Sequence, residues 1–256
     1  MVKLGLGSSS TTVVSILCAL LIESEYIPLS TCLNNTIPPT FYTLLSQLAC
    51  KAHNAAQGRI GSGFDVITAV FGSCIFEKTE SDCLHTPFSL PPHISIALSC
   101  GGKESSKTPV LVRRVREWRQ QTDAEALWKS YRENNEQIVR VFQQKTHSET
   151  LEGWIDNVRQ LYQAKLEIMY QISEQSASDI VPRDLYSVLK ETNTVKGVIG
   201  CMVAGAGGFD SFYCLYDDRL INISEISAIW KKGGCEVATI CESKQGIHIC
   251  CTLEEL

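Results

Sequence analysis

The chain has 256 residues, of which 44% are hydrophobic and 20% are charged, and its formal net charge is −5. This length suits one substantial domain or two small ones, and the hydrophobic periodicity along most of it argues against disorder. A mildly acidic chain lacks the basic face that binds a nucleic-acid backbone, so no nucleic-acid partner is expected. No apolar run reaches the roughly 18 residues of a membrane-spanning helix, so no membrane partner is expected either.

The chain is rich in cysteine, with 12 of them. No two have the CxxC spacing, and none lies between Gly101 and Gly200. Several stand in apolar surroundings, where cysteine behaves as a small hydrophobic residue. Their spacing and the size of the chain favour buried, reduced thiols over a disulfide framework.

The N-terminal region leaves a second interpretation open. Lys3 and the apolar run 13–22 have the form of a signal peptide, and sequons at Asn34 and Asn222 fit a secreted protein. Against this, only one cation precedes the run, two acidic residues follow it, and no clear cleavage site is present. A secreted, cysteine-rich binding protein is therefore the weaker alternative.

In chain order, the first predicted element is a glycine-serine loop over 3–10 that leads into a helix. Ser8, Ser9 or Ser10 is expected to cap the helix. Its body, 13–22, is apolar all round, which predicts a buried helix.

The rest of the chain shows helices and strands that do not alternate regularly. This pattern favours an α+β fold with antiparallel strand pairing over a doubly wound parallel sheet. The expected elements up to residue 93 are a proline-containing loop over 28–40, a helix over 41–57 ended by Gly58, a tight loop over 61–65, a short apolar element over 66–71, and a polar surface connection over 79–93. A strand over 93–99, a polar loop over 101–109, a helix through Val112, Val115 and Trp118, and two amphipathic helices over 127–142 and 151–172 are expected next. The last expected elements are a short helix over 182–192, a strand over 195–203, a glycine-rich turn over 205–210, a strand over 211–216, a helix over 224–232, and closing strands over 237–240 and 247–252.

The loop over 3–10 (KLGLGSSS) has the composition of an anion-binding site. Glycines let the backbone approach an anion, the helix N-terminus offers free N–H groups, and serine hydroxyls add donors or a Mg²⁺ ligand. The loop lacks the GxxxxGK[ST] pattern of a P-loop, and no strand precedes it as in a Rossmann fingerprint. Taken alone, it fits a ligand-free helix cap equally well.

Later segments of the sequence make the interpretation of this loop more specific. It is followed by residues 53–66 (HNAAQGRIGSGFDV), then by 69–73 (AVFGS), 108–118 (TPVLVRRVREW) and 197–210 (GVIGCMVAGAGGFD). In this order and spacing, the chain resembles the GHMP small-molecule kinases, and within them the phosphomevalonate kinases of the fungal and plant type. The resemblance covers nearly the whole chain.

The resemblance implies an ATP-dependent phosphotransferase with a phosphate acceptor. ATP and Mg²⁺ would be the cofactors, and 5-phosphomevalonate would be the acceptor, giving 5-diphosphomevalonate for isoprenoid and sterol precursors. In the implied site, Gly5, Leu6, Gly7, Ser8 and Ser9 hold the ATP phosphates, Ser8 and Ser9 touch the metal, Asp65 and Ser62 are catalytic, and Arg59, Ser106, Thr108, Arg113, Gly205, Gly207 and Gly208 bind the acceptor.

Several of these assignments compete with a purely structural interpretation. Arg113 and its neighbour Arg114 fit a solvated helix face as well as an anion site, and His53 is expected to pack or hydrogen-bond structurally. The acceptor phosphate has a second pKa near ~6, so it is mostly ionised at neutral pH. Asp65, with a cationic partner, is therefore expected to orient the nucleophile more than to remove a proton.

The resemblance also implies a fold, a domain division and a location. The expected fold is a two-layer sheet-and-helix arrangement, with a partial ribosomal protein S5 domain 2-like ATP-binding domain over 1–90 and a ferredoxin-like α/β sandwich over 91–256. A cytoplasmic monomer or weak dimer is expected. Family members carry a substantial segment before the phosphate loop. The further alternative is therefore a catalytically incomplete member of this lineage, with weak or absent ATP binding.

Overall fold

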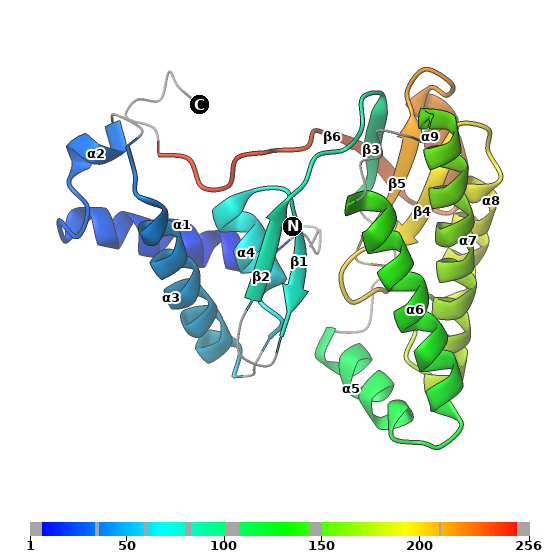
Figure 1. The fold of residues 1–256 in the computed structure, drawn as a ribbon. Coiled ribbons are helices and arrows are strands. Elements are labelled where there is room, and N and C mark those ends of the chain that lie inside the picture. Colours follow the sequence, from blue (N-terminus) through cyan, green and yellow to red (C-terminus); the bar gives the residue numbers. More distant parts are fainter. Residues whose placement is uncertain are drawn as a thin grey trace. The chain divides into compact units, whose positions relative to one another are not determined.

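The computed structural model describes residues 7–33, 36–58, 61–79, 83–100, 108–143, 150–209 and 211–249. The chain divides into two compact units, and each is treated by itself. One contains Leu90–Cys241, and the other contains the described residues before Leu90 together with those after Cys241. Figure 1 gives the order of the elements.

The unit that begins the chain is mainly helical. Its helices enclose a core that includes Val14, Cys18, Phe41, Leu45 and Val70. The elements are α1 (Ser8–Glu23), α2 (Leu29–Leu33), α3 (Pro39–Gln57), α4 (Phe64–Phe71), and an antiparallel hairpin of β1 (Cys74–Lys78) and β2 (Cys83–Pro87).

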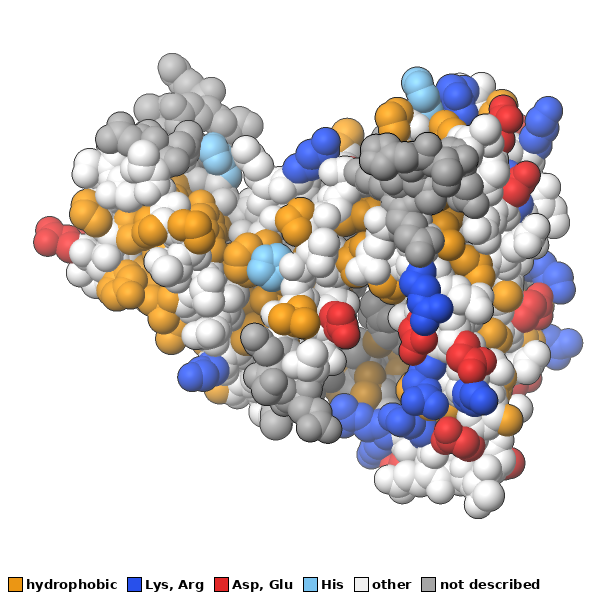
Figure 2. Space-filling view, in the orientation of Figure 1, with side chains coloured by type: hydrophobic (Ala, Val, Ile, Leu, Met, Phe, Trp, Pro, Cys, Tyr) orange, Lys and Arg blue, Asp and Glu red, His pale blue; other side chains and the backbone are white. Residues whose placement is uncertain are grey.

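Helix α1 differs from its prediction in two respects. Val14 and Cys18 are buried, but Ile16 and Leu20 are 55% and 57% exposed, so the prediction of burial all round is wrong. Figure 2 shows hydrophobic side chains gathered at the surface of this unit. The cap is Gly7, and no side chain caps the helix, so the predicted serine cap is also wrong. The Ser9 hydroxyl instead lies beside His53, and the Ser10 hydroxyl donates to Gly7 O.

Helix α3 confirms the prediction most closely. It ends at Gln57, and Gly58 adopts the left-handed conformation (φ 60°) that glycine reaches without a Cβ penalty. Two neighbouring expectations need correction. The expected loop over 28–40 contains α2, and the expected surface connection over 79–93 contains β2.

The second unit is built around one antiparallel sheet, flanked by helices (Figure 1). The strand order is β4-β5-β3-β6. The elements are β3 (Ile94–Cys100), α5 (Thr108–Arg119), α6 (Ala124–Gln143), α7 (Leu151–Ser176), α8 (Arg183–Asn193), β4 (Val198–Val203), β5 (Phe212–Asp217), α9 (Ile223–Lys232) and β6 (Glu236–Ile240).

The connectivity of this sheet is β-α-β-β-α-β, with the strands that begin and end the series side by side. This is the ferredoxin-like order, and every pairing is antiparallel, which confirms the predicted α+β class. Strand β4 is buried along its whole length. Buried Asn193 at the end of α8 holds it there, since its side chain bonds both the N–H and the C=O of Cys201.

After β6, the chain returns to the first unit. The N–H of Ser73 donates to Ser243 O (2.9 Å), and the N–H of Ile247 donates to Val70 O (3.3 Å). A Cβ on Gly72 would lie 2.6 Å from Lys244 O, so glycine allows the two backbones to meet. Residues 247–249 form no strand, which corrects the expected closing strand as far as Ile249.

Two expectations from composition concern thiols and membranes. The nine cysteines whose side chains the structure describes are reduced thiols. Burial raises the pKa of the Cys18 thiol to about 11, and Cys32 acts in the same direction. Among the described helices, none is long and apolar enough to cross a membrane.

Candidate phosphoryl-transfer site

The start of α1 offers unoccupied backbone donors. Gly7 has a left-handed conformation (φ 72°), and its carbonyl oxygen accepts a hydrogen bond from the N–H of Thr11. The hydroxyl of buried Ser10 also donates to Gly7 O. Because no side chain caps α1, its first N–H groups are left for an anion. Ser8 and Ser9 are exposed at this end.

A buried histidine connects this helix end to α3. The Ser9 hydroxyl lies 3.1 Å from His53 Nε2, and the Gln57 amide nitrogen lies 2.8 Å from the same atom. Since the amide N–H can only donate, Nε2 accepts and the ring proton resides on Nδ1. Nδ1 faces Asp65 Oδ2 at 4.0 Å.

Asp65 stands in the first turn of α4, directly beside the phosphate loop. A Cβ built on Gly7 would lie 3.3 Å from Asp65 Cβ. Oδ1 accepts a hydrogen bond from the N–H of Val66 (3.0 Å). Among the described residues, Oδ2 faces only the distant His53 ring, and the side chain is 24% exposed. The carboxylate therefore has one oxygen held by the backbone and one oxygen available to a ligand.

Ser9, His53 and Asp65 are the residue types of a hydrolase triad, but the geometry argues against one. The distance of 4.0 Å from Nδ1 to Oδ2 is too long for the hydrogen bond that orients a catalytic imidazole. Nε2 is also shared with Gln57, so it is not reserved for the Ser9 proton. The arrangement fits a positioning network better than nucleophilic catalysis.

The loop before Asp65 is held by contacts from two directions. The N–H of Gly61 donates to Asn54 Oδ1 on α3 (2.7 Å), and Lys78 Nζ on β1 donates to Gly61 O (2.9 Å). Gly63 caps α4 with φ 88°. Ser62, between these glycines, is exposed and free to meet a ligand with its hydroxyl.

Lys78 is a cation at this site that the sequence pattern did not reveal. Burial raises the pKa of the neighbouring Cys50 thiol, Cys83 and Asp65 act in the same direction, and Lys78 acts against them. Asp65 and Lys78 thus both lie close enough to Cys50 to influence its charge. An isolated lysine in a five-residue strand has no sequence signal, and only the fold places it here.

The predicted acceptor residues that the structure describes lie in the other unit. Thr108 begins α5, and Arg113 is 69% exposed and pairs with Glu117 (3.8 Å), as a solvated helix face would. Arg114 is more constrained, because its guanidinium donates to Ala177 O (2.6 Å). The Arg114 interaction ties α5 to the end of α7.

The glycine-rich turn after β4 is packed against the segment that follows α7. The N–H of Gly208 donates to Ile180 O (2.8 Å), and a Cβ on Gly207 would collide with that same oxygen. Gly205, Gly207 and Gly208 have φ values of 59°, 85° and 84°, which glycine alone adopts readily. The turn is fixed by its own glycines rather than by side chains.

The structure thus brings together Gly7, Ser8, Ser9, Ser62 and Asp65 in one unit, and Thr108, Arg113 and the glycine turn in the other. The predicted site residues Gly5, Leu6, Arg59 and Ser106 lie outside the described residues. No cluster of three or more His, Cys, Asp or Glu that could hold a metal ion occurs among the residues that were placed.

Sequence comparison supports the resemblance stated above. The chain is 30% identical over 267 residues to phosphomevalonate kinase erg8 of Aspergillus fumigatus, covering 90% of this chain and 53% of that protein. It is 27% identical over 269 residues to phosphomevalonate kinase ERG8 of Gibberella zeae, covering 93% of this chain and 58% of that protein. Over most of its length, the chain is similar in sequence to proteins named phosphomevalonate kinase. It spans a little over half the length of these relatives, and no family model matches it.

Solved structures support the fold of this kinase homologue. A Lin0012 protein from Listeria innocua matches with a TM-score of 0.72 at 15% identity, covering 93% of this chain and 66% of that one. The Leishmania enzyme titled L. major mevalonate kinase in complex with R-mevalonate matches with a TM-score of 0.63 at 17% identity, with the same coverage. The predicted GHMP kinase-like fold is confirmed.

Proposed function

We propose that this chain transfers the γ-phosphate of ATP to 5-phosphomevalonate, giving 5-diphosphomevalonate and ADP. The observation that carries the proposal is the contact between Gly7 and Asp65, which sets an uncapped helix N-terminus beside a half-satisfied carboxylate. Phosphoryl transfer needs positioning and charge neutralisation more than covalent chemistry. The helix N-terminus offers positive potential to phosphate oxygens, and the carboxylate serves in positioning.

The proposed mechanism gives each described group one task. The first N–H groups of α1 bind ATP phosphate oxygens, and the Ser8 and Ser9 hydroxyls add contacts. An acceptor phosphate oxygen attacks the γ-phosphorus, and the bond to the bridging oxygen of ADP breaks. Asp65 positions the acceptor phosphate through a hydrogen-bond donor that lies between the two anionic groups. His53 holds the Ser9 hydroxyl and turns its Nδ1 side toward Asp65. Lys78 supplies positive charge at the same loop.

The described residues offer Mg²⁺ few oxygen ligands, which still suits the way this ion is usually bound. Mg²⁺ usually keeps several waters and is held by one or two carboxylates together with substrate phosphates. Asp65 provides one carboxylate oxygen without a backbone bond, and exposed Ser8 provides a hydroxyl. When bound with ATP, the ion would neutralise phosphate charge. Ser62, in the same unit as Asp65, would bind the acceptor through its hydroxyl, and Thr108, Arg113 and the glycine turn are further acceptor-binding candidates in the other unit.

The decisive experiment is a coupled ADP-release assay on the purified chain with Mg·ATP and 5-phosphomevalonate. Mevalonate serves as the control acceptor. Turnover with 5-phosphomevalonate alone is the expected result. A folded chain that gives no turnover and does not bind ATP would instead identify a catalytically incomplete member of the lineage. We place the reaction in the cytoplasm, although an Arabidopsis thaliana relative carries the name "Phosphomevalonate kinase, peroxisomal".

Nucleotide binding can be tested at Gly7. Gly7→Ala puts a methyl group 3.0 Å from Ser10 Oγ and 3.3 Å from Asp65 Cβ, at a residue with positive φ. The phosphate loop must shift, so we expect the Kd for Mg·ATP to rise by about 10-fold or more. Isothermal titration calorimetry measures this change directly.

Gly58→Ala is the matched control for this variant. Gly58 has a similar positive φ of 60°, but an added Cβ meets nothing within 4 Å. It should therefore share the backbone strain of Gly7→Ala and keep the Kd within about 2-fold. Equal Kd values for the two variants would mean that the Gly7 backbone does not cradle the phosphates.

A further inference from the structure

A cavity of about 280 Å³ opens in the second unit beside α5. We name it the α5 pocket. It is bounded by residues of α5, by Trp128 and Tyr131 of α6, by Ile172 of α7, by Ile180, and by the turn residues Gly205 and Ala206. Its lining includes Gly205 of the predicted acceptor turn, but no residue from the start of α1 or from the group around Asp65.

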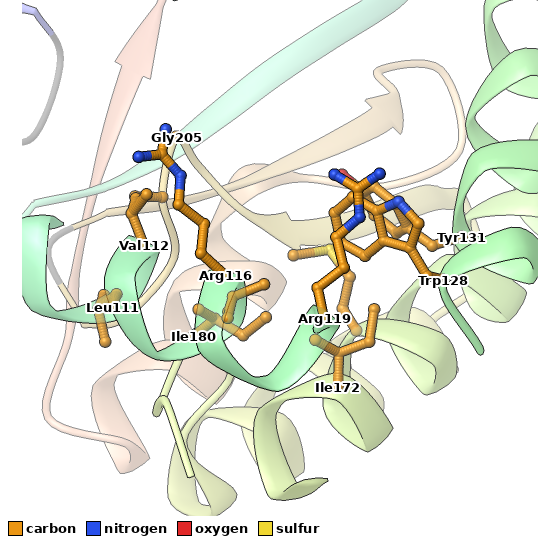
Figure 3. Close-up of a pocket in the computed structure, with 12 residues that line it drawn as sticks. Leu111, Val112, Arg116, Arg119, Trp128, Tyr131, Ile172, Ile180 and Gly205 are labelled. Carbon is orange, nitrogen blue, oxygen red and sulfur yellow. The ribbon is translucent and has the colours of Figure 1, made fainter. Parts of the chain in front are cut away.

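The α5 pocket has apolar walls and a cationic edge. Leu111 and Val115 of α5 form the wall with Ile172 and Ile180. Figure 3 shows the side chains of Arg116 and Arg119 leaving α5 on the same side, above Leu111, Ile172 and Ile180. Their spacing of three residues makes them neighbours on the helix surface.

Within the part of the chain that the structure describes, neither Arg116 nor Arg119 forms an ion pair with a carboxylate. Other α5 arginines do, because Arg113 pairs with Glu117 and Arg114 lies 3.9 Å from Asp179. The Arg119 guanidinium instead lies 4.7 Å from the centre of the Trp128 ring. The Arg116 head ends near Gly205 and the Arg119 head lies over Trp128, so two guanidinium groups stand along the edge of an apolar cavity. Such groups are suited to a ligand anion, since their forked donors match phosphate and carboxylate oxygens.

A third polar group at the pocket lacks a partner. The indole N–H of Trp128 is buried and makes no hydrogen bond among the described residues. An unmet buried donor is unfavourable, so such groups are rare in folded proteins and often mark a binding site. Movement of the exposed Arg119 side chain from the ring toward a bound anion gives a ligand oxygen room beside this donor.

We propose that the α5 pocket binds a small amphipathic anion, with its apolar part against Val115, Ile172 and Ile180 and its charged group on Arg116 and Arg119. The volume lies at the lower end of small-molecule pockets, which favours a compact, single-chain ligand. The proposal concerns a second site and does not depend on the kinase activity proposed above.

Isothermal titration calorimetry with octyl phosphate tests the proposal, and octanol is the uncharged control. We expect saturable binding of one octyl phosphate per chain and at least about 10-fold weaker binding of octanol. Arg116→Gln and Arg119→Gln should each raise the Kd by about 10-fold, and Trp128→Phe should raise it by about 5-fold. Arg140→Gln on α6, an exposed arginine outside the pocket, should leave the Kd unchanged.

A filling variant keeps the test independent of charge. Val115→Phe leaves both arginines in place but occupies the apolar wall, and it should abolish binding while circular dichroism shows an intact fold. Equal Kd values for octyl phosphate and octanol, or for the arginine variants and Arg140→Gln, would overturn the proposal. Displacement of octyl phosphate by 5-phosphomevalonate would assign the cavity to the acceptor and overturn a separate site. Displacement is not expected, with or without Mg·ATP.

Discussion

Asp65→Asn is expected to lower kcat with 5-phosphomevalonate by about 100-fold or more, with a smaller change in KM. Asparagine retains an Oδ1 that can accept from the N–H of Val66, so the start of α4 stays intact. What is lost is the negative charge of the oxygen that faces the ligand and His53. Steady-state ADP release, measured at saturating Mg·ATP, checks the expected change.

Asp123→Asn is the control for this experiment, because Asp123 is exposed in the turn before α6 and removal of its charge should leave kcat unchanged. Near-normal turnover of Asp65→Asn in an active chain would contradict the assigned role. Loss of activity in both variants would show only that the chain tolerates charge removal poorly. The comparison therefore separates a positioned carboxylate from a general effect of net charge.

Gly207→Ala is expected to lower the free energy of unfolding of the second unit by about 3 kcal/mol. The residue combines φ 85° with a backbone contact, and an added Cβ would collide with Ile180 O. Relief of the clash requires the turn to move away and break the hydrogen bond from Gly208 to Ile180. The strained backbone conformation and the clash with Ile180 O both destabilise the variant, so we expect this to be the largest stability effect of a single added methyl group.

Gly205→Ala in the same turn provides the matched comparison. Gly205 has φ 59°, but nothing lies within 4 Å of an added Cβ, so only the backbone preference is lost, about 1 kcal/mol. Urea unfolding followed by tryptophan fluorescence reads out this unit alone, because it holds every tryptophan of the chain: Trp118, Trp128, Trp154 and Trp230. Equal destabilisation by the two variants would contradict the close contact at Gly207.

The sequence predicted elements whose ends carry local signals. Gly58 ends α3 where expected, and α5 follows the polar loop with Pro109 in its first turn. The resemblance to the GHMP kinases also implied that the segment around Gly7 and the segment around Asp65 act together, and the fold places Gly7 close to Asp65. Those features depend on backbone preference and on short motifs, which a sequence states directly.

Other features depended on tertiary packing and could not be inferred. The apolar run of α1 does not specify how many of its faces will be covered, so Ile16 and Leu20 were expected to be buried. The hairpin of β1 and β2 consists of short strands with mixed composition, which have no clear periodicity. The position of Lys78 beside Gly61 follows from this hairpin and was missed with it.

The return of residues 242–249 to the first unit has a consequence for synthesis on the ribosome. Residues 7–89 emerge early, yet the backbone partners of Val70 and Ser73 are made only after the whole second unit. The second unit is continuous over Leu90–Cys241 and can fold as it emerges. The unit that contains α1 therefore gains these backbone hydrogen bonds only after residues 243–247 have been made.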